Sequence, residues 1–181
     1  MVVLGCSAGG IEALKTILTS LPKTFGYAIA IVQHVAGDSN TLADFFGQIC
    51  HCPIIEVEDK QPIIPGNIFI APAGYHLMVE DKKYFSLSVE EPVRFSRPSI
   101  DVLFETAAQV YKSKTVGIVL TGANEDGADG LKQIKNQGGL AVVQDPKTAK
   151  FPAMPEAAIN EASPQYILKL EEISQFLDSL G

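Results

Sequence analysis

Residues 1–10 read MVVLGCSAGG, and this segment carries the strongest structural pattern in the chain. Residues 2–4 are apolar and predict a buried strand that breaks at Gly5. A single hydroxyl, that of Ser7, follows before two glycines lead into an amphipathic segment. A strand, a tight glycine turn and a helix together expose a side chain, or bind an anion, at the helix N-terminus. Ser7 is therefore our candidate nucleophile.

The composition predicts one soluble domain over residues 1–181, because 46% of the 181 residues are hydrophobic. A formal net charge of −7 argues against a nucleic-acid partner, which requires a basic surface. No apolar run approaches the ~20 residues of a membrane span, and no secretion signal precedes the first strand. Three cysteines suggest no disulfide framework. We expect a cytoplasmic protein with reduced thiols and no membrane insertion.

Helical and strand patterns alternate along most of the chain. Helices are expected at residues 11–21, 41–49, 100–111 (capped by Ser99), 131–137, 156–160 and 173–180, and strands at 27–33, 53–57, 115–121, 140–144 and 166–170. Residues 58–98 differ, because Gly and Pro recur among short strands at 67–71, 76–80 and 84–89, the last two joined by a turn at Asp81 and Lys82. The pattern predicts an α/β fold of three layers (α/β/α). Its sheet is mainly parallel, doubly wound and Rossmann-like, with a small antiparallel β excursion.

Three polar side chains follow separate strands of this sheet. Ser7 follows the first strand, His34 follows the second, and Asp126 lies in the glycine-rich loop after the strand at 115–121. Open parallel sheets bind ligands outside the carboxyl ends of their strands. A hydroxyl, an imidazole and a carboxylate at that edge are the parts of an activated nucleophile, its base and the acid that orients the base.

Each of the three also has a purely structural interpretation. Ser7 is suited to cap a helix, His34 to end a strand, and Asp126 to form an Asp-Gly turn. Their coincidence at strand ends favours the catalytic interpretation. The two other histidines are weaker candidates, because His51 lies between two cysteines and His76 begins a short strand of the excursion.

A nucleophile elbow is one motif that matches the first turn. Residues 5–9, GCSAG, fit the pattern G-x-S-x-G. The α/β-hydrolases place their catalytic residues in the order Ser, acid, His, whereas this chain has the order Ser, His, acid. We therefore reject that family and keep the geometry of the elbow.

A dinucleotide-binding fingerprint also overlaps this turn. Gly5, Ser7 and Gly10 occupy its three glycine positions, so the middle glycine is replaced. Gln33 and His34 stand where an acid should bind the ribose. Both departures disfavour a nucleotide cofactor.

Metal and thiol chemistry are also weakly supported. Residues 50–52, CHC, lack a second pair of zinc ligands, and the acidic cluster at 124–129 lacks the spacing of a calcium loop. Cys6 should point away from Ser7 into the core. Arg94 and Arg97 precede a helix in an arginine-poor chain, which suggests recognition of a carboxyl group or another anion.

Five blocks of sequence resemble the catalytic domain of the chemotaxis protein-glutamate methylesterases, the CheB family. They are GCSAGG (5–10), IVQH (31–34), RFSRPSIDVLF (94–104), VLTGANEDGADGL (119–131) and FPAMPEAA (151–158). The resemblance covers essentially the whole chain. It implies a serine hydrolase that removes methyl esters from glutamates of chemoreceptor helices, releases methanol, also deamidates receptor glutamines in many members, and needs no cofactor.

The resemblance also implies roles for individual residues. The catalytic serine, histidine and aspartate fall on Ser7, His34 and Asp126. The oxyanion and cleft positions fall on six further residues: Ala8, Ala123, Asn124, Arg94, Arg97 and Met154, the last expected at the rim of the cleft. Family members often carry a receiver or methyltransferase domain, and neither is expected within residues 1–181.

Two departures from the family pattern bear on activity. Ala8 replaces the usual threonine after the serine, and Ala123-Asn124 replaces the usual Met-Gly. Three hypotheses follow: a receptor methylesterase, a catalytically impaired relative that binds receptor, and an esterase with another substrate. Net negative charge provides no long-range attraction to acidic receptor segments, so docking should depend on local shape and on the arginines.

Overall fold

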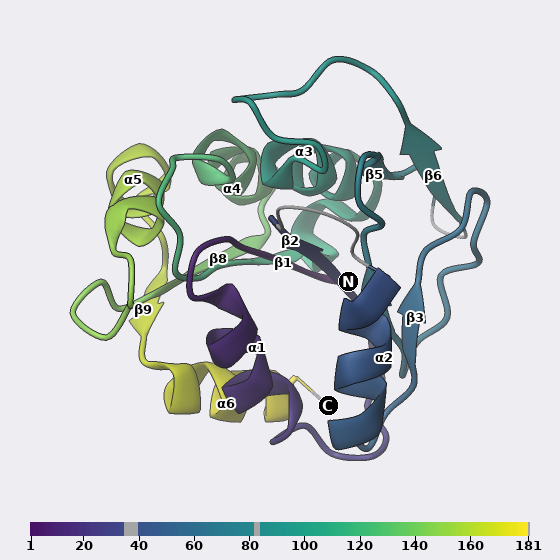
Figure 1. Cartoon of the computed structure of the whole chain (residues 1–181). Coiled ribbons are helices and arrows are strands. Elements are labelled where there is room, and N and C mark those ends of the chain that lie inside the picture. Colours follow the sequence, from purple (N-terminus) through teal and green to yellow (C-terminus); the bar gives the residue numbers. More distant parts are fainter. Residues whose placement is uncertain (35–39, 82–83, 181) are drawn as a thin grey trace.

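A central parallel sheet organises the chain, as the computed structural model in Figure 1 shows for residues 1–34, 40–81 and 84–180. Its seven strands follow the order β3-β4-β2-β1-β7-β8-β9, and all pair in parallel. Their bounds are β1 (Val2–Cys6), β2 (Ile29–Gln33), β3 (Ile54–Glu56), β4 (Ile68–Ile70), β7 (Val116–Val119), β8 (Leu140–Gln144) and β9 (Tyr166–Leu168). β1 lies at the centre, where the order reverses between the two halves of the chain.

Helices cover both faces of the sheet, which confirms the expected three layers. One face carries α1 (Gly10–Leu18), α2 (Asn40–Ile49) and α6 (Leu170–Asp178). The other carries α3 (Ile100–Tyr111), α4 (Ala128–Asn136) and α5 (Ala153–Ala162), with a short 3-10 turn, η1 (Lys112–Lys114), after α3. Among the described residues, none of these helices is long and apolar enough to cross a bilayer.

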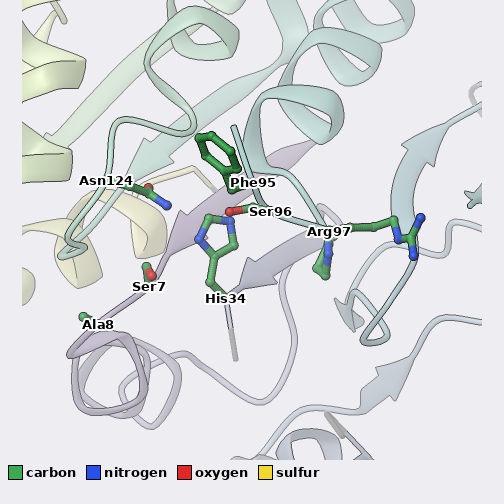
Figure 2. Close-up of a pocket in the computed structure, with 8 residues that line it drawn as sticks. Ser7, Ala8, His34, Phe95, Ser96, Arg97 and Asn124 are labelled. Carbon is green, nitrogen blue, oxygen red and sulfur yellow. The ribbon is translucent and has the colours of Figure 1, made fainter. Parts of the chain in front are cut away.

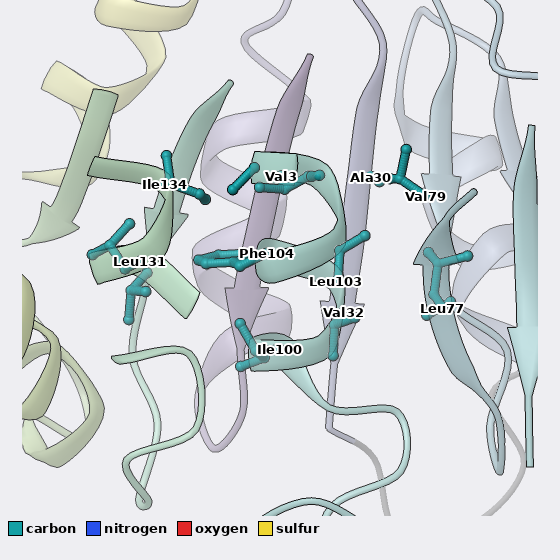
Figure 3. Packing of buried hydrophobic residues seen from close by; sticks show 14 of the residues in the cluster. Val3, Ala30, Val32, Leu77, Val79, Ile100, Leu103, Phe104, Leu131 and Ile134 are labelled. Carbon is teal, nitrogen blue, oxygen red and sulfur yellow. The ribbon is translucent and has the colours of Figure 1, made fainter. Parts of the chain in front are cut away.

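Alternation along β1 explains why the sheet has a core on each side. Val2 and Leu4 belong to the cluster under α1 and α6, whereas Val3 packs on the opposite face with Leu103 and Phe104 of α3 (Figure 3). All these side chains are at most 1% exposed. Because neighbouring strands are buried on both faces in the same way, the positions where they end are fixed by two packed cores.

The β excursion is smaller than the sequence pattern suggests. β5 (His76–Val79) and β6 (Phe85–Ser88) form the expected antiparallel pair. The strand predicted at 67–71 does not belong with them, because β4 pairs in parallel between β3 and β2. All three residues of β4 are buried, as a central parallel strand requires. The Lys82 part of the predicted turn lies outside the described residues.

Several boundaries differ from the predicted ones by a few residues. α1 ends at Leu18, three residues early, and a capped turn replaces its expected last turn. α5 begins at Ala153, so Pro155 is its third residue. The cap of α3 is as predicted, since Ser99 Oγ accepts a hydrogen bond from the amide of Val102.

Candidate active site

Ser7, His34 and Asp126, called here the strand-end group, follow three neighbouring strands. β1 lies between β2 and β7 in the sheet, and these residues follow β1, β2 and β7 in that order. The amide of His34 donates to Cys6 O at 3.0 Å and that of Ser7 donates to Thr121 O at 3.0 Å. The backbone ladder therefore continues past the strands, and the three segments leave the sheet together at its switch point.

A cavity of about 480 Å³ opens over these strand ends. It is lined by Ser7, Ala8, His34, Phe95, Ser96, Arg97, Pro98 and Asn124 (Figure 2). Ser7 is half-buried, and its hydroxyl makes no hydrogen bond within the part of the chain that the structure describes. The figure shows the imidazole of His34 beside it, with one ring nitrogen on the side of Ser7. A free hydroxyl and an imidazole thus share one accessible space.

Asp126 is fully buried and binds the far side of the imidazole. Its Oδ2 lies 2.8 Å from His34 Nε2. The same carboxylate accepts hydrogen bonds from Ser99 Oγ (2.8 Å) and from the amides of Ile100 (2.7 Å) and Asp101 (3.1 Å). The start of α3 therefore holds the carboxylate with donors on both oxygens.

These contacts determine how the imidazole is protonated. Burial raises the pKa of Asp126, but the hydrogen bond from His34 and those from the Ile100 and Asp101 amides outweigh burial and leave the pKa below its ordinary value. An ionised carboxylate only accepts hydrogen bonds, so His34 Nε2 carries the proton. Nδ1 of the neutral ring is then an acceptor, and it is the nitrogen that remains for Ser7.

Gln33 ties together the segments that carry Ser7 and His34. It is 5% exposed, and its Nε2 donates to Ser7 O at 2.9 Å and to His34 O at 2.7 Å. Its Oε1 accepts from Cys6 Sγ at 3.0 Å. Cys6 points into the core, as predicted, and burial raises the pKa of its thiol. A buried neutral thiol is a poor nucleophile.

Gly5 allows α3 to reach the strand ends. A Cβ at Gly5 would lie 2.3 Å from Ile100 Cγ2. Ile100 is the first residue of α3, and its amide binds Asp126. The absent side chain therefore lets the N-terminus of α3 approach β1 and bring its amides to Asp126.

The N-termini of α3 and α4 are linked by reciprocal hydrogen bonds to two carboxylates. Asp126, just before α4, binds the start of α3, whereas Asp101 of α3 accepts hydrogen bonds from the amides of Gly127 (2.9 Å) and Gly130 (2.7 Å) at the start of α4. Burial raises the pKa of Asp101 to about 7, with a further contribution from the Asp126 carboxylate; the Gly130 amide and the Arg94 guanidinium oppose this. Each helix thus receives its N-terminal anion from the other.

Arg94 does not line the cavity, contrary to the sequence prediction. Its Nε donates to Asp101 Oδ2 at 3.1 Å, and its two other nitrogens bind Glu125 and Asp129. The nearby carboxylates, with Asp129 contributing most, raise the pKa of Arg94 above its ordinary value. Because it is surrounded by acids of its own chain, Arg94 is a structural cross-link rather than an anion site.

Arg97 lines the cavity only at its edge. Its Nη1 donates to the carbonyls of Val89 (2.8 Å) and Glu90 (3.0 Å). Figure 2 shows the side chain extending away from Ser7. The guanidinium is therefore positioned beside the cavity, where it contacts backbone rather than the hydroxyl of Ser7.

Met154 is not at the rim, which corrects a second prediction. It is fully buried, and its amide donates to Gly122 O at 3.0 Å. A Cβ at Gly122 would lie 2.6 Å from Met154 Sδ, so the side chain fills space beneath the loop rather than facing the cleft. Ala123 is exposed next to the cavity and is not one of the residues that line it.

Two of the predicted oxyanion positions offer free donors. The amides of Ala8 and Ala123 donate to no other residue in the described ranges. Asn124 Oδ1 accepts from the amide of Asp126 at 3.2 Å, which leaves its amide nitrogen turned toward the cavity (Figure 2). The unpaired amide of Ala8 and the side-chain nitrogen of Asn124 therefore belong to two residues that line the cavity together with Ser7.

Sequence reasoning missed the residues that support the acid and close the cavity. His76 is 1% exposed; its Nδ1 accepts from the amide of Ser99, and its Nε2 contacts Glu91 O. It thereby holds the cap that binds Asp126. Phe95 lines the cavity but belongs to no periodic pattern, so no sequence pattern singles it out. Its exposure, which only the structure shows, is what draws attention to it.

Three comparisons with known proteins agree. The family model described as CheB methylesterase matches residues 2–177. A Leptospira interrogans protein is 52% identical over 177 residues, which cover 96% of this chain and 91% of that protein. The Thermotoga maritima CheB methylesterase catalytic domain has a crystal structure that superposes with a TM-score of 0.95 at 34% identity, covering 99% of this chain and 97% of that one.

Longer relatives match over part of their length. The protein-glutamate methylesterase/protein-glutamine glutaminase 1 of Carboxydothermus hydrogenoformans is 39% identical over 97% of this chain and 53% of its own length. The Thermotoga maritima protein-glutamate methylesterase/protein-glutamine glutaminase is 34% identical over 99% of this chain and 54% of its own length. The chain thus spans about half the length of these two relatives.

Proposed function

Because this chain belongs to the CheB methylesterase family, we propose that it hydrolyses glutamate methyl esters on chemoreceptors, with Ser7, His34 and Asp126 as its catalytic triad. One observation carries the assignment of residues: His34 is bonded through Nε2 to a buried carboxylate at 2.8 Å and shares a cavity with the unpaired hydroxyl of Ser7. Apo active sites often lack the final hydrogen bond between nucleophile and base, which tightens when substrate binds.

The first step forms an acyl-enzyme. His34 Nδ1 accepts the proton of the Ser7 hydroxyl while Ser7 Oγ attacks the γ-carbonyl of the methylated glutamate. Asp126 stabilises the imidazolium that results. In this proposal the negative charge on the carbonyl oxygen is stabilised by the amide of Ala8 and the side-chain amide of Asn124, two residues that line the cavity with Ser7. Collapse of the tetrahedral intermediate releases methanol, which takes its proton from His34.

The second step returns the enzyme to its starting state. His34 removes a proton from water, and the hydroxide oxygen attacks the acyl carbonyl. The bond to Ser7 Oγ breaks, Ser7 recovers its proton from His34, and a free glutamate remains on the receptor. A glutamine substrate gives the same acyl-enzyme with release of ammonia, so the same site supports the deamidation named in the relatives.

The Ala8 and Ala123-Asn124 departures leave this chemistry intact in our proposal, because the backbone amide of Ala8 does not depend on its side chain and Asn124 supplies a side-chain donor of its own. They favour altered substrate choice over loss of activity. Receptor helices are the protein partners in this proposal, and we place the reaction in the cytoplasm, where those helices lie.

Replacement of the nucleophile tests the proposal. Ser7→Ala should lower the rate of methanol release from a methylated chemoreceptor by about 10⁴-fold or more. Ser113→Ala, which removes an exposed hydroxyl from η1, is the matched control and should retain the wild-type rate. Wild-type activity in Ser7→Ala would overturn the assignment, and a serine-directed fluorophosphonate that fails to label Ser7 in the wild-type protein would point to a non-catalytic relative.

A further inference from the structure

A tight turn at Val93–Ser96 faces the catalytic cavity. The amide of Val93 donates to Ser96 O at 3.1 Å, and the amide of Ser96 donates to Val93 O at 2.9 Å. The two central residues, Arg94 and Phe95, have φ angles of 48° and 63°. Positive φ at both central positions is the pattern of a type I′ turn.

Arg-Phe is an unfavourable sequence for such a turn. Type I′ turns strongly prefer Asn-Gly, because other L-residues are strained in the left-handed region. Backbone strain of this kind persists only where the surroundings impose it, and it concentrates at functional sites. Each of the two side chains therefore needs its own physical explanation.

Contacts within the protein explain why an arginine occupies position 94 of the turn despite its positive φ. Its guanidinium binds Asp101 of α3, Glu125 of the loop between β7 and α4, and Asp129 of α4. These ion pairs hold the turn against the two helices that support Asp126. Arg94 is therefore an anchor, and the position of the turn relative to the cavity is fixed.

Contacts within the protein do not explain why a phenylalanine occupies position 95 of the turn. Its side chain is fully exposed, at 103% relative accessibility, whereas Val89, the next most exposed large apolar residue among those the structure describes, reaches 68%. Among the described residues no other aromatic ring stacks against it. It nevertheless lines the cavity beside Ser96 and opposite Ser7 (Figure 2). A strained turn thus holds an apolar ring in water at the mouth of the site.

We propose that Phe95 contacts the protein substrate, packing against an apolar side chain that flanks the methylated glutamate. The inference rests on the proposed function, since it names what the same site recognises beyond the ester. Charge favours an apolar contact: the protein carries a net charge of −7, and Glu125 and Asp129 are exposed beside the turn. An acidic receptor segment gains no long-range attraction there, so burial of the ring supplies affinity.

A double-mutant cycle tests this contact directly. Two helical peptides would each carry one glutamate γ-methyl ester. Leucine occupies the positions three and four residues to either side in the first peptide, and glutamine in the second, because these positions share one face of a helix. Phe95→Ala should lower kcat/KM for the leucine peptide about tenfold, mainly through KM, and lower it no more than about twofold for the glutamine peptide.

Three further proteins make the result decisive. Phe95→Leu should restore most of the preference for the leucine peptide. Ile64→Ala, which removes an exposed apolar side chain that does not line the cavity, should keep the wild-type values for both peptides. Ser7→Ala should hydrolyse neither.

The outcomes separate this inference from the proposed function. Equal loss on both peptides, or no loss on either, would overturn the role of Phe95 while leaving the methylesterase assignment intact. If Phe95 instead binds a second protein domain, the kinetics on both peptides stay at wild-type values, which also overturns it. Absence of methanol release from methylated receptor by the wild-type protein would overturn both.

Discussion

The two sides of the proposed catalytic cavity are held in place by different interactions. The strand-end group emerges from strands buried on both faces, and Asp126 is held by four hydrogen bonds in the interior. The Val93–Ser96 turn lies outside the sheet, has strained φ angles and is anchored through partly exposed ion pairs of Arg94. One side is positioned by packing and the other by surface charge.

The difference follows from what each side must do. A misplacement of reacting groups by about 1 Å can slow a reaction about 100-fold, so the groups that transfer a proton need rigid positions. Contact with an apolar side chain tolerates small displacements but requires an exposed ring. We therefore expect substitutions in the strand-end group to abolish chemistry, and substitutions in the turn to change recognition and stability.

The largest effect should come from Asp126→Asn. All four hydrogen bonds to Asp126 are donated to it, and an amide nitrogen in its place would face a donor. His34 then loses its fixed tautomer, and kcat for ester hydrolysis should fall ~10³- to 10⁴-fold. Asp145→Asn, which changes another strand-end carboxylate bonded to the amide of Lys147, should keep near wild-type kcat. Comparable losses of kcat in both variants would show that Asp126 has no role that Asp145, at the same edge of the sheet, does not share.

The effect of Asp126→Asn on the free energy of unfolding should depend on pH. The pKa of Asp126 lies below its ordinary value in the folded state, so the carboxylate stabilises the fold at neutral pH and this contribution is lost as pH falls through the folded pKa. The difference in free energy of unfolding between wild type and Asp126→Asn should therefore be largest near pH 7 and shrink below about pH 4. Urea denaturation at several pH values measures it, and a constant difference would contradict the assigned charge.

A smaller effect is expected from Gly10→Ala. A Cβ at Gly10 would lie 2.0 Å from Gln33 Oε1 and 2.9 Å from Cys6 Sγ, both buried. Overpacking there should lower the free energy of unfolding by ~2–3 kcal/mol. Gly47→Ala in α2 is the matched control, because nothing lies within 4 Å of its Cβ and alanine should stabilise the helix by ~0.5–1 kcal/mol. Equal tolerance at both positions would show that packing does not fix the Ser7 turn.

The smallest effect is expected from Phe95→Gly, and it has the opposite sign. Glycine adopts positive φ without strain, so the free energy of unfolding should rise by ~0.5–1 kcal/mol while kcat/KM for the leucine peptide falls. Ile64→Gly is the control, since Ile64 is exposed but is not among the residues with positive φ, and it should not gain stability. A Phe95→Gly protein less stable than wild type would show that the ring supports the fold.

The parts of the molecule that follow from periodicity could be predicted from the sequence. Buried strands such as β2 and β8 are apolar up to a final glutamine, and the order of strands and helices leaves few topologies for a parallel sheet. That constraint is why Ser7, His34 and Asp126 could be placed at one edge, although they are far apart in the chain. The family of the chain was likewise recognisable from its five sequence blocks.

The features that depend on tertiary contacts could not be predicted. β4 has only three residues and lies among turns, so local pattern grouped it with the hairpin instead of the main sheet. Arg94 and Arg97 are alike in sequence context, and only the structure distinguishes Arg94, which is bound to three carboxylates, from Arg97 at the cavity edge. Met154 looks like a loop residue, but the missing side chain of Gly122 gives it an interior position.

The reciprocal hydrogen bonds of Asp126 with the start of α3, and of Asp101 with the start of α4, link the appearance of activity to the completion of folding. Asp126, which binds His34, precedes α4 and accepts hydrogen bonds from the start of α3, so neither helix alone can position it. A nascent or partly assembled chain has the alcohol and the imidazole but no oriented proton relay. Hydrolytic activity should consequently appear in a single stage during refolding, together with the docking of α3 against α4. The rate of ester hydrolysis therefore reports when these two helices dock.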